Sequence, residues 1–151
     1  MRVLGIDYGQ RRIGLALSDP LGIVAGGLPT VTVGSDDEAF AAVAKVVEER
    51  GVREIVVGLP RNMNGSIGPQ AEKVGAFAER LRALGKPVHL MDERLTSARA
   101  NRVMLDHGFS RKKRGKHVDR MAAQFILQTW LNARKTSKDD GPSGGADNTI
   151  P

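Results

Sequence analysis

The sequence predicts a single α/β domain built around a mixed five-stranded sheet. Three strand-like segments with short connections come first, and two more strands then each follow a helical segment. Strands joined by short turns pair antiparallel, whereas strands joined through a helix pair parallel. A chain of 151 residues can bury one hydrophobic core but is too short for two ordinary lobes. We therefore expect three antiparallel strands, then two parallel ones, flanked by helices.

The first three strands are expected at residues 2–8, 12–18 and 23–33. The second alternates apolar and small residues, and a turn around Gly9 and Gln10 joins it to the first as a hairpin. The third is rich in β-branched residues, but it also contains two glycines and a proline. These three residues indicate a bulge or an edge position.

Helix and strand then alternate through the middle of the chain. Ser35 and Asp36 are capping residues before a helix over 37–50, and a proline opens a second helix over 69–84. Each helix is followed by a glycine and then by a short run, 54–60 and 87–93, that we interpret as a strand. The run at 54–60 is almost wholly apolar, as is typical of a strand covered on both faces.

Two further helical segments, 97–108 and 118–135, end the predicted domain, and a polar tail follows. Residues 136–151 are rich in glycine, proline, serine and aspartate, and we expect them to be disordered. The tail carries −2 of the formal net charge of +6, which leaves +8 on residues 1–135. A folded part this basic favours a polyanionic partner such as nucleic acid.

Composition excludes several kinds of chemistry. The chain has no cysteine, which rules out disulfides, thiolate metal sites and thiol nucleophiles and suits a reducing compartment. No apolar run is long enough to span a bilayer, and the N-terminus lacks a signal-peptide pattern. We therefore expect a cytoplasmic protein without a membrane partner.

Acidic residues fall at the ends of several predicted elements. Asp7 ends the first strand, Asp92 and Glu93 end the fifth, and Asp119 opens the last helix on its apolar face. Ligand crevices of α/β sheets lie beyond the carboxyl ends of parallel strands, so these groups could converge. Two carboxylates about 4 Å apart repel by roughly 4 kcal/mol at an effective dielectric near 20. Such a cluster requires protons or a divalent cation, and an all-oxygen site suits Mg²⁺ or Mn²⁺.

Each acidic residue also has a purely structural interpretation. Asp7 could shape the turn through its side chain, and Asp119 could complement the dipole in the first turn of its helix. Asp92 and Glu93 point to opposite faces of a strand, so at most one of them faces the site. Periodicity does not choose between them.

Four stretches carry a family resemblance: GIDYGQRRIGLALSD, IVVGLPRNMNGS, MDERLTSARA and VDRMAAQFILQTWL. In this order and spacing they resemble the signature blocks of the YqgF/RuvX family of pre-16S rRNA nucleases and Holliday-junction resolvases. The resemblance implies a ribonuclease H-like fold and a role in maturing the 5′ end of 16S rRNA in the bacterial cytoplasm. It also implies that Asp7, Glu93 and Asp119 are the catalytic, metal-binding carboxylates, and so selects Glu93 over Asp92.

The mechanism that the resemblance implies is metal-assisted hydrolysis of a phosphodiester without a protein nucleophile. Arginines nearby can bind phosphate through a bidentate fork. The run RKKRGKH at 111–117 comes just before Asp119 and could hold a substrate strand, although a solvated loop has the same composition. The candidate substrate contacts are Gly9, Arg12, Arg94, Thr96, Arg111, Lys112, Lys113, Arg114 and Lys116.

Several residues near the predicted site have a second interpretation. Arg94 could pair with Asp92, and Thr96 could cap the helix that follows. Tyr8 could stack on a nucleobase, whereas Trp130 fits the core better.

Other functions fit parts of the sequence. A Holliday-junction resolvase acting on branched DNA would use the same carboxylates and would need a two-fold dimer, so monomer and homodimer both stay open. A binding module associated with RNA or transcription would keep the fold and basic surface without turnover. An ATPase of the actin and sugar-kinase group needs a second lobe, for which this chain has no room. The nucleotide-binding motifs GxxxxGK[ST] and GxGxxG are absent.

Overall fold

The computed structural model describes residues 1–62, 64–93 and 111–139, with side chains in the last range from 121 to 135 only. Within these residues, no helix combines the length and apolar character needed to cross a membrane. The elements are β1 (Arg2–Tyr8), β2 (Arg12–Ser18), β3 (Ala25–Thr32), α1 (Asp36–Glu49), β4 (Val52–Leu59), α2 (Pro69–Leu81), the short helix η1 (Arg82–Leu84), β5 (Val88–Asp92) and α4 (Arg111–Asp139).

The strands form one sheet in the order β3-β2-β1-β4-β5. The pairs β1–β2 and β2–β3 are antiparallel, and the pairs β1–β4 and β4–β5 are parallel. This is the predicted arrangement of three antiparallel strands followed by two parallel ones. It brings the carboxyl ends of β1, β4 and β5 to the same edge of the sheet.

The two N-terminal hairpins show why the chain turns where it does. A Cβ atom added to Gly9 would stand 2.6 Å from the carbonyl oxygen of Arg12, so only glycine fits the first turn. The third strand begins at Ala25 instead of residue 23 and lies at the edge of the sheet, as its proline and glycines predict. Its register against β2 shifts between Ile13 and Leu15.

The helix α2 begins as predicted, and α1 begins one residue early, with Ser35 as its cap and Asp36 as its first residue. The Ser35 hydroxyl accepts a hydrogen bond from the Glu38 N–H at 3.2 Å, and the Glu38 carboxylate accepts one from the Gly34 N–H at 2.5 Å. Pro69 opens α2, and the tighter turn of η1 continues it as far as Gly85, where φ is +78°.

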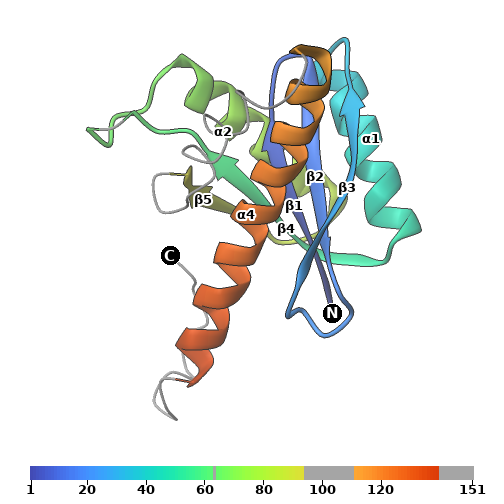
Figure 1. The fold of residues 1–151 in the computed structure, drawn as a ribbon, viewed down its shortest axis with the longest axis vertical. Helices are drawn as coiled ribbons and strands as arrows, with labels where there is room; N and C mark the ends of the chain where they lie inside the picture. The colour runs from blue at the N-terminus through green and yellow to red at the C-terminus, as the bar shows by residue number, and fades with distance from the viewer. Residues whose placement is uncertain (63, 94–110, 140–151) are drawn as a thin grey trace.

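Helices cover both faces of the sheet (Figure 1). On one face, α1 and α2 pack over residues such as Leu4, Ile6 and Val57. On the other face, α4 packs over Val3 and Val56. The approach of α4 is close because β1 carries Gly5 here, where an added Cβ would stand 2.7 Å from the Cβ of Leu127.

The last helix differs from its predicted bounds. It begins at Arg111, not at residue 118, so Asp119 lies eight residues inside α4 and not in its first turn. The interpretation of Asp119 as a first-turn dipole partner is therefore wrong, as is that of the run 111–117 as a loop. The run lacks apolar periodicity, but lysine and arginine are good helix formers. The helix also ends four residues beyond the predicted boundary at 135.

Some predictions fall outside the described residues. They are the helix at 97–108, the candidate contacts Arg94 and Thr96, and the tail from residue 140 onward.

Candidate active site

Asp7 lies on the face of the sheet that α4 covers. Residues of β1 alternate between the faces, and Val3 belongs to the α4 side while Leu4 belongs to the other. Asp7 therefore follows Val3 and Gly5 on the α4 face, near the carboxyl end of β1. Its exposed fraction is only 8%. A carboxylate this buried requires a compensating positive charge or hydrogen bonds.

Glu93 reaches the same face from β5. Met91 belongs to the α4-side core, and the His89 ring lies 5.1 Å from that of Trp130 on α4. Glu93 comes two residues after Met91 and is only 2% exposed. Asp92 lies between them and points to the opposite face, because side chains along a strand alternate. The structure thus answers the question that periodicity left open, because Glu93 and not Asp92 shares the face of Asp7.

Gly58 of β4 lies between these two carboxylates. The register of β1 and β4 pairs Ile6 with Val57, which places Gly58 next to Asp7, and the register of β4 and β5 pairs Gly58 with Met91. A Cβ at residue 58 would stand 2.9 Å from Oε1 of Glu93 and 2.4 Å from Cδ1 of Ile126. The absence of a side chain therefore lets the carboxylate of Glu93 lie over β4.

A second glycine flanks Asp7 on its other side, since β2 pairs Gly14 with it. Gly14 and Gly58 therefore add no side chains of their own to the sheet on either side of Asp7. Sequence reasoning assigned no role to either glycine. The signal for Gly58 is present in the sequence, because a glycine inside a short apolar strand indicates a close approach by another group.

Asp119, the third predicted carboxylate, lies two helical turns before Leu127, which packs on Gly5. In Figure 1, α4 runs antiparallel to β1, so its N-terminal turns lie toward the end of the sheet that carries Asp7. The side chain of Asp119 is outside the described set. Among the side chains that the structure does describe, no three acids or histidines are grouped as a metal site would need.

The candidate substrate contacts are only partly placed. Gly9 and the half-buried Arg12 lie in and just after the first hairpin turn, at the end of the sheet that carries Asp7. Arg61, which sequence reasoning did not single out, follows β4 at the same edge. The five cations Arg111, Lys112, Lys113, Arg114 and Lys116 all belong to the first two turns of α4.

Tyr8 is part of the core, so its predicted stacking on a nucleobase is wrong. It is 8% exposed, its ring lies 4.5 Å from that of Phe77, and its hydroxyl donates to the Asp36 carboxylate. Burial and the neighbouring Asp36 raise the pKa of Tyr8 to about 12. Since adjacent strand residues face opposite ways, Asp7 and Tyr8 could not both reach the α4 face. The core position predicted for Trp130 is confirmed, at 1% exposure.

The strand order and the helices on both faces define a ribonuclease H-like fold. Thermus thermophilus RuvC, solved in complex with a Holliday junction substrate, is similar with a TM-score of 0.60 and 19% identity, over 89% of this chain and 96% of RuvC. The Holliday junction resolvase of fowlpox virus is similar with a TM-score of 0.51 and 12% identity, over 87% of this chain and 99% of the resolvase. At such low identities these likenesses establish the fold alone.

The chain belongs to the RuvX family. The family model, described as Holliday junction resolvase, matches residues 1–133. A relative from Moorella thermoacetica is 52% identical over 133 residues, which is 87% of this chain and 95% of the relative. Another from Clostridium acetobutylicum is 48% identical over 134 residues, or 88% of this chain and 99% of the relative. Both carry the name "Putative pre-16S rRNA nuclease". The predicted family resemblance is thereby confirmed.

Proposed function

We propose that this protein is a nuclease that hydrolyses phosphodiester bonds in structured nucleic acid, with the 5′ end of pre-16S rRNA as its substrate. Membership of the RuvX family and the names of the relatives support this class of activity. The observation that carries the proposal is the pair of buried carboxylates, Asp7 and Glu93, on one face of the sheet, with Glu93 lying over Gly58 of the strand between them. An rRNA substrate also assigns the protein to the cytoplasm.

The second part of the proposal is that Asp7, Glu93 and Asp119 hold Mg²⁺ or Mn²⁺. The chemistry of the donors fits, because the two described carboxylates are buried and oxygen is the ligand that these hard cations prefer. Gly58 fits as well, since its lack of a side chain lets an oxygen of Glu93 lie over the strand next to Asp7. A bound divalent cation would supply an activated water and neutralise charge on the phosphate.

The residues around the carboxylates would orient the substrate. Arg12 begins β2 at the carboxylate edge and can hold a backbone phosphate in a bidentate fork. The basic turns of α4, residues 111–116, precede Asp119 on the same helix, so a strand that they bind would be led toward the carboxylates. In metal-assisted hydrolysis an activated water would attack phosphorus, so no protein nucleophile is required.

A cleavage assay separates this function from its two rivals. The protein is incubated with a 5′-extended 16S rRNA fragment and with a four-way DNA junction, in Mg²⁺, in Mn²⁺ and in EDTA. We expect metal-dependent cleavage of the RNA that Asp7→Asn and Glu93→Gln both abolish. The matched control is Asp92→Asn, which removes a neighbouring charge from the other face and should keep the activity.

Each of the other outcomes would assign a different function to the protein or contradict the assigned site. Symmetric cleavage of the junction alone, by a homodimer, would make the protein a resolvase. Tight RNA binding without cleavage in either metal would make it a binding module. Equal loss of activity in Asp92→Asn and Glu93→Gln would contradict the assignment of the site to one face of β5.

A further inference from the structure

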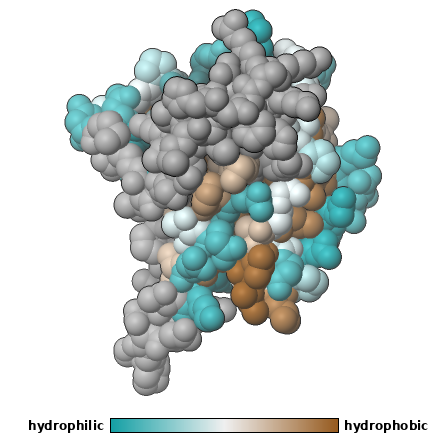
Figure 2. All heavy atoms as spheres, in the orientation of Figure 1, coloured by the Kyte–Doolittle hydropathy of each residue, from teal (hydrophilic) through white to brown (hydrophobic). Residues whose placement is uncertain are grey.

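A turn at the end of the sheet opposite Asp7 and Glu93 exposes a group of aliphatic side chains. Residues 19–24 connect β2 to β3, and together with the N-terminal residue they form an apolar patch of Met1, Leu21, Ile23 and Val24. The exposed fractions of these side chains are 57%, 79%, 49% and 58%. Figure 2 shows hydrophobic residues gathered at the lower end of the molecule, where the β2–β3 connection lies in Figure 1. Contiguous exposed apolar surface marks an interaction site more often than scattered residues do.

The turn that carries this patch is rigid. Oδ1 of Asp19 accepts hydrogen bonds from the N–H groups of Ile23 at 2.6 Å and Val24 at 3.0 Å. The backbone of Asp19 bonds to Gly22 and Val24, and Gly22 has a φ of +71° that only glycine adopts readily. The same N–H groups, of Val24 and Ile23, hold the pKa of the Asp19 carboxyl below its usual value. The aliphatic side chains are therefore presented by an ordered loop, which loses little entropy on binding.

The turn is also fastened to α4. Gln128 accepts a hydrogen bond from the Ala25 N–H at 2.9 Å through Oε1 and donates one to the Ile23 carbonyl at 2.9 Å through Nε2. Between the turn and the helix lies a groove of about 300 Å³, whose walls include Leu21, Ile23 and Leu131. This volume is at the lower end of the range for ligand pockets and suits an inserted side chain.

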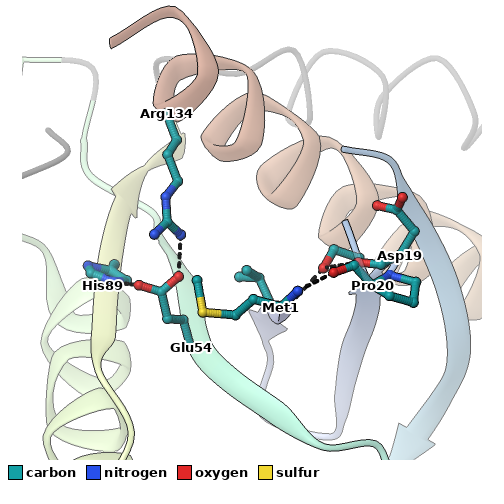
Figure 3. A network of polar contacts seen from close by, with 8 residues as sticks. Met1, Asp19, Pro20, Glu54, His89 and Arg134 are labelled. Carbon is teal, nitrogen blue, oxygen red and sulfur yellow. Dashed lines mark hydrogen bonds and ion pairs between the residues drawn. The ribbon is translucent and has the colours of Figure 1, made fainter. Parts of the chain in front are cut away.

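The groove has a positive rim. Arg134 and Lys135 of α4 line it, and none of the described residues that line it is acidic. Figure 3 shows the ion pair between Arg134 and the Glu54 carboxylate, with Met1 close to it. The guanidinium also lies 5.0 Å from the centre of the Trp130 ring. Glu54 thus offsets the charge of Arg134 and holds it in place, and the exposed Lys135 supplies the other positive charge of the rim.

We propose that this groove binds an acidic segment of a partner protein, with an aliphatic side chain of that segment inserted between the turn and α4. The apolar floor and the positive rim together match such a segment. Nucleic acid fits less well, because the described residues that line the groove include no aromatic side chain for a base to stack on.

The place of the groove gives it a function separate from the candidate active site. It lies at the start of β1 and toward the end of α4, whereas Asp7 and Glu93 lie at the carboxyl ends of β1 and β5. A partner bound here leaves the carboxylate edge of the sheet open. The proposal therefore does not depend on the nuclease activity.

The test is a titration of the full chain, labelled at its methyl groups, with a synthetic peptide of aspartate and glutamate around two adjacent leucines. We expect saturable NMR shifts at Leu21, Ile23 and Leu131. Leu21→Ser and Lys135→Glu should each weaken binding about tenfold or more. Ile67→Ser is the matched control, because Ile67 is an exposed aliphatic residue (46%) outside the groove, and it should leave the affinity unchanged.

Four results would overturn the proposal. One is a peptide with serine in place of leucine that binds equally well, and another is no saturation at all. A third is an RNA oligonucleotide that displaces the peptide from the same methyl groups. The fourth is that the protein itself fills the groove. The evidence would be a dimer that Leu21→Ser dissociates, or methyl shifts at the groove when residues 140–151 are deleted.

Discussion

The carboxylate of Glu93 lies directly over Gly58, where a Cβ atom would come within 2.9 Å of Oε1. Glu93 extends from β5, and β4 separates that strand from the strand of Asp7. A side chain at residue 58 would stand in the space that the Glu93 carboxylate occupies over β4, the strand beside that of Asp7. The identity of this one strand residue thus decides whether an acid on β5 can share a site with an acid on β1.

Gly58→Ala is therefore expected to impair the site more than the fold. The added methyl group displaces both Glu93 and Ile126, and overpacking of this kind costs about 1–3 kcal/mol of the free energy of unfolding. We expect the Mg²⁺ concentration for half-maximal cleavage to rise about tenfold or more, as when a residue supporting a metal ligand is altered. The double variant Gly58→Ala/Ile126→Val should recover stability but not metal affinity.

Gly5→Ala is the control for this prediction. An added Cβ at Gly5 meets Leu127 at 2.7 Å on the same face of the sheet, but no carboxylate. Because the atoms it meets include the backbone of α4, which cannot swing aside, we expect at least as large a loss in the free energy of unfolding and an unchanged Mg²⁺ requirement. A rise in the Mg²⁺ requirement of Gly5→Ala equal to that of Gly58→Ala would show that general loosening of α4 explains both effects.

Tyr8 should titrate near pH 12 in the folded protein. It is the only tyrosine in the chain, so tyrosinate absorbance at high pH reports on it alone. Burial, followed by the hydrogen bond and charge of Asp36, raises its pKa from 10.0 to about 12. Because the raised pKa favours the protonated form in the folded state, its contribution to stability is complete below pH 10 and is lost between pH 10 and 12.

The variant Asp36→Asn tests the cause of this shift. Removing the negative charge should lower the Tyr8 pKa toward 10 without exposing the ring, and Tyr8→Phe should remove the absorbance change altogether. An unchanged midpoint in Asp36→Asn would assign the shift to burial alone.

Glu54 should contribute to the packing of α4 against the sheet. Its carboxylate is paired with Arg134 and lies 3.5 Å from Nε2 of His89, and its side chain is 13% exposed. Hydrogen bonds to charged groups are worth about 1.5–3 kcal/mol, so Glu54→Gln should lower the free energy of unfolding by roughly that amount. Trp130 is the only tryptophan, and its fluorescence during urea denaturation measures the change. The exposed Glu48→Gln should have no effect.

Nucleic-acid binding should depend on salt through the first turns of α4. Each phosphate contact adds about 0.7 to 0.9 to the slope of log K against log salt concentration. Lys112→Gln/Lys113→Gln should therefore lower the slope for the 16S rRNA fragment by roughly 1.4 to 1.8. Lys45→Gln/Lys73→Gln removes the same charge from α1 and α2 on the other face and should leave the slope unchanged. Equal slopes in both double variants would contradict an RNA contact at 111–116.

The fold was predictable because each connection limits the pairing of the strands it joins. Short turns forced β1, β2 and β3 into antiparallel neighbours, and the helices forced β4 and β5 to be parallel. The ends of helices were harder to predict where the hydrophobic pattern of the sequence was weak. The start of α4 was missed because its first turns contain no apolar stripe, although their lysines and arginines form helix readily.

The site was only partly predictable, for a different reason. The face on which a strand-end residue lies depends on the partner strand, so Asp92 and Glu93 could not be separated until Met91 was located in the α4-side core. The burial of Tyr8 follows from the same alternation once Asp7 is placed. Gly58 has no functional group, and its importance became visible only with the distance to Glu93.

The parallel connections of the sheet also bear on when activity can arise during synthesis. Asp7 is made early, but β5 and α4 emerge from the ribosome last, after both crossovers to β4 and β5. A nascent or prematurely terminated chain thus contains Asp7 without Glu93 opposite it or α4 above it. Under the proposed function, such fragments would be inert, which would spare the translating ribosome and its own RNA from cleavage by an unfinished enzyme.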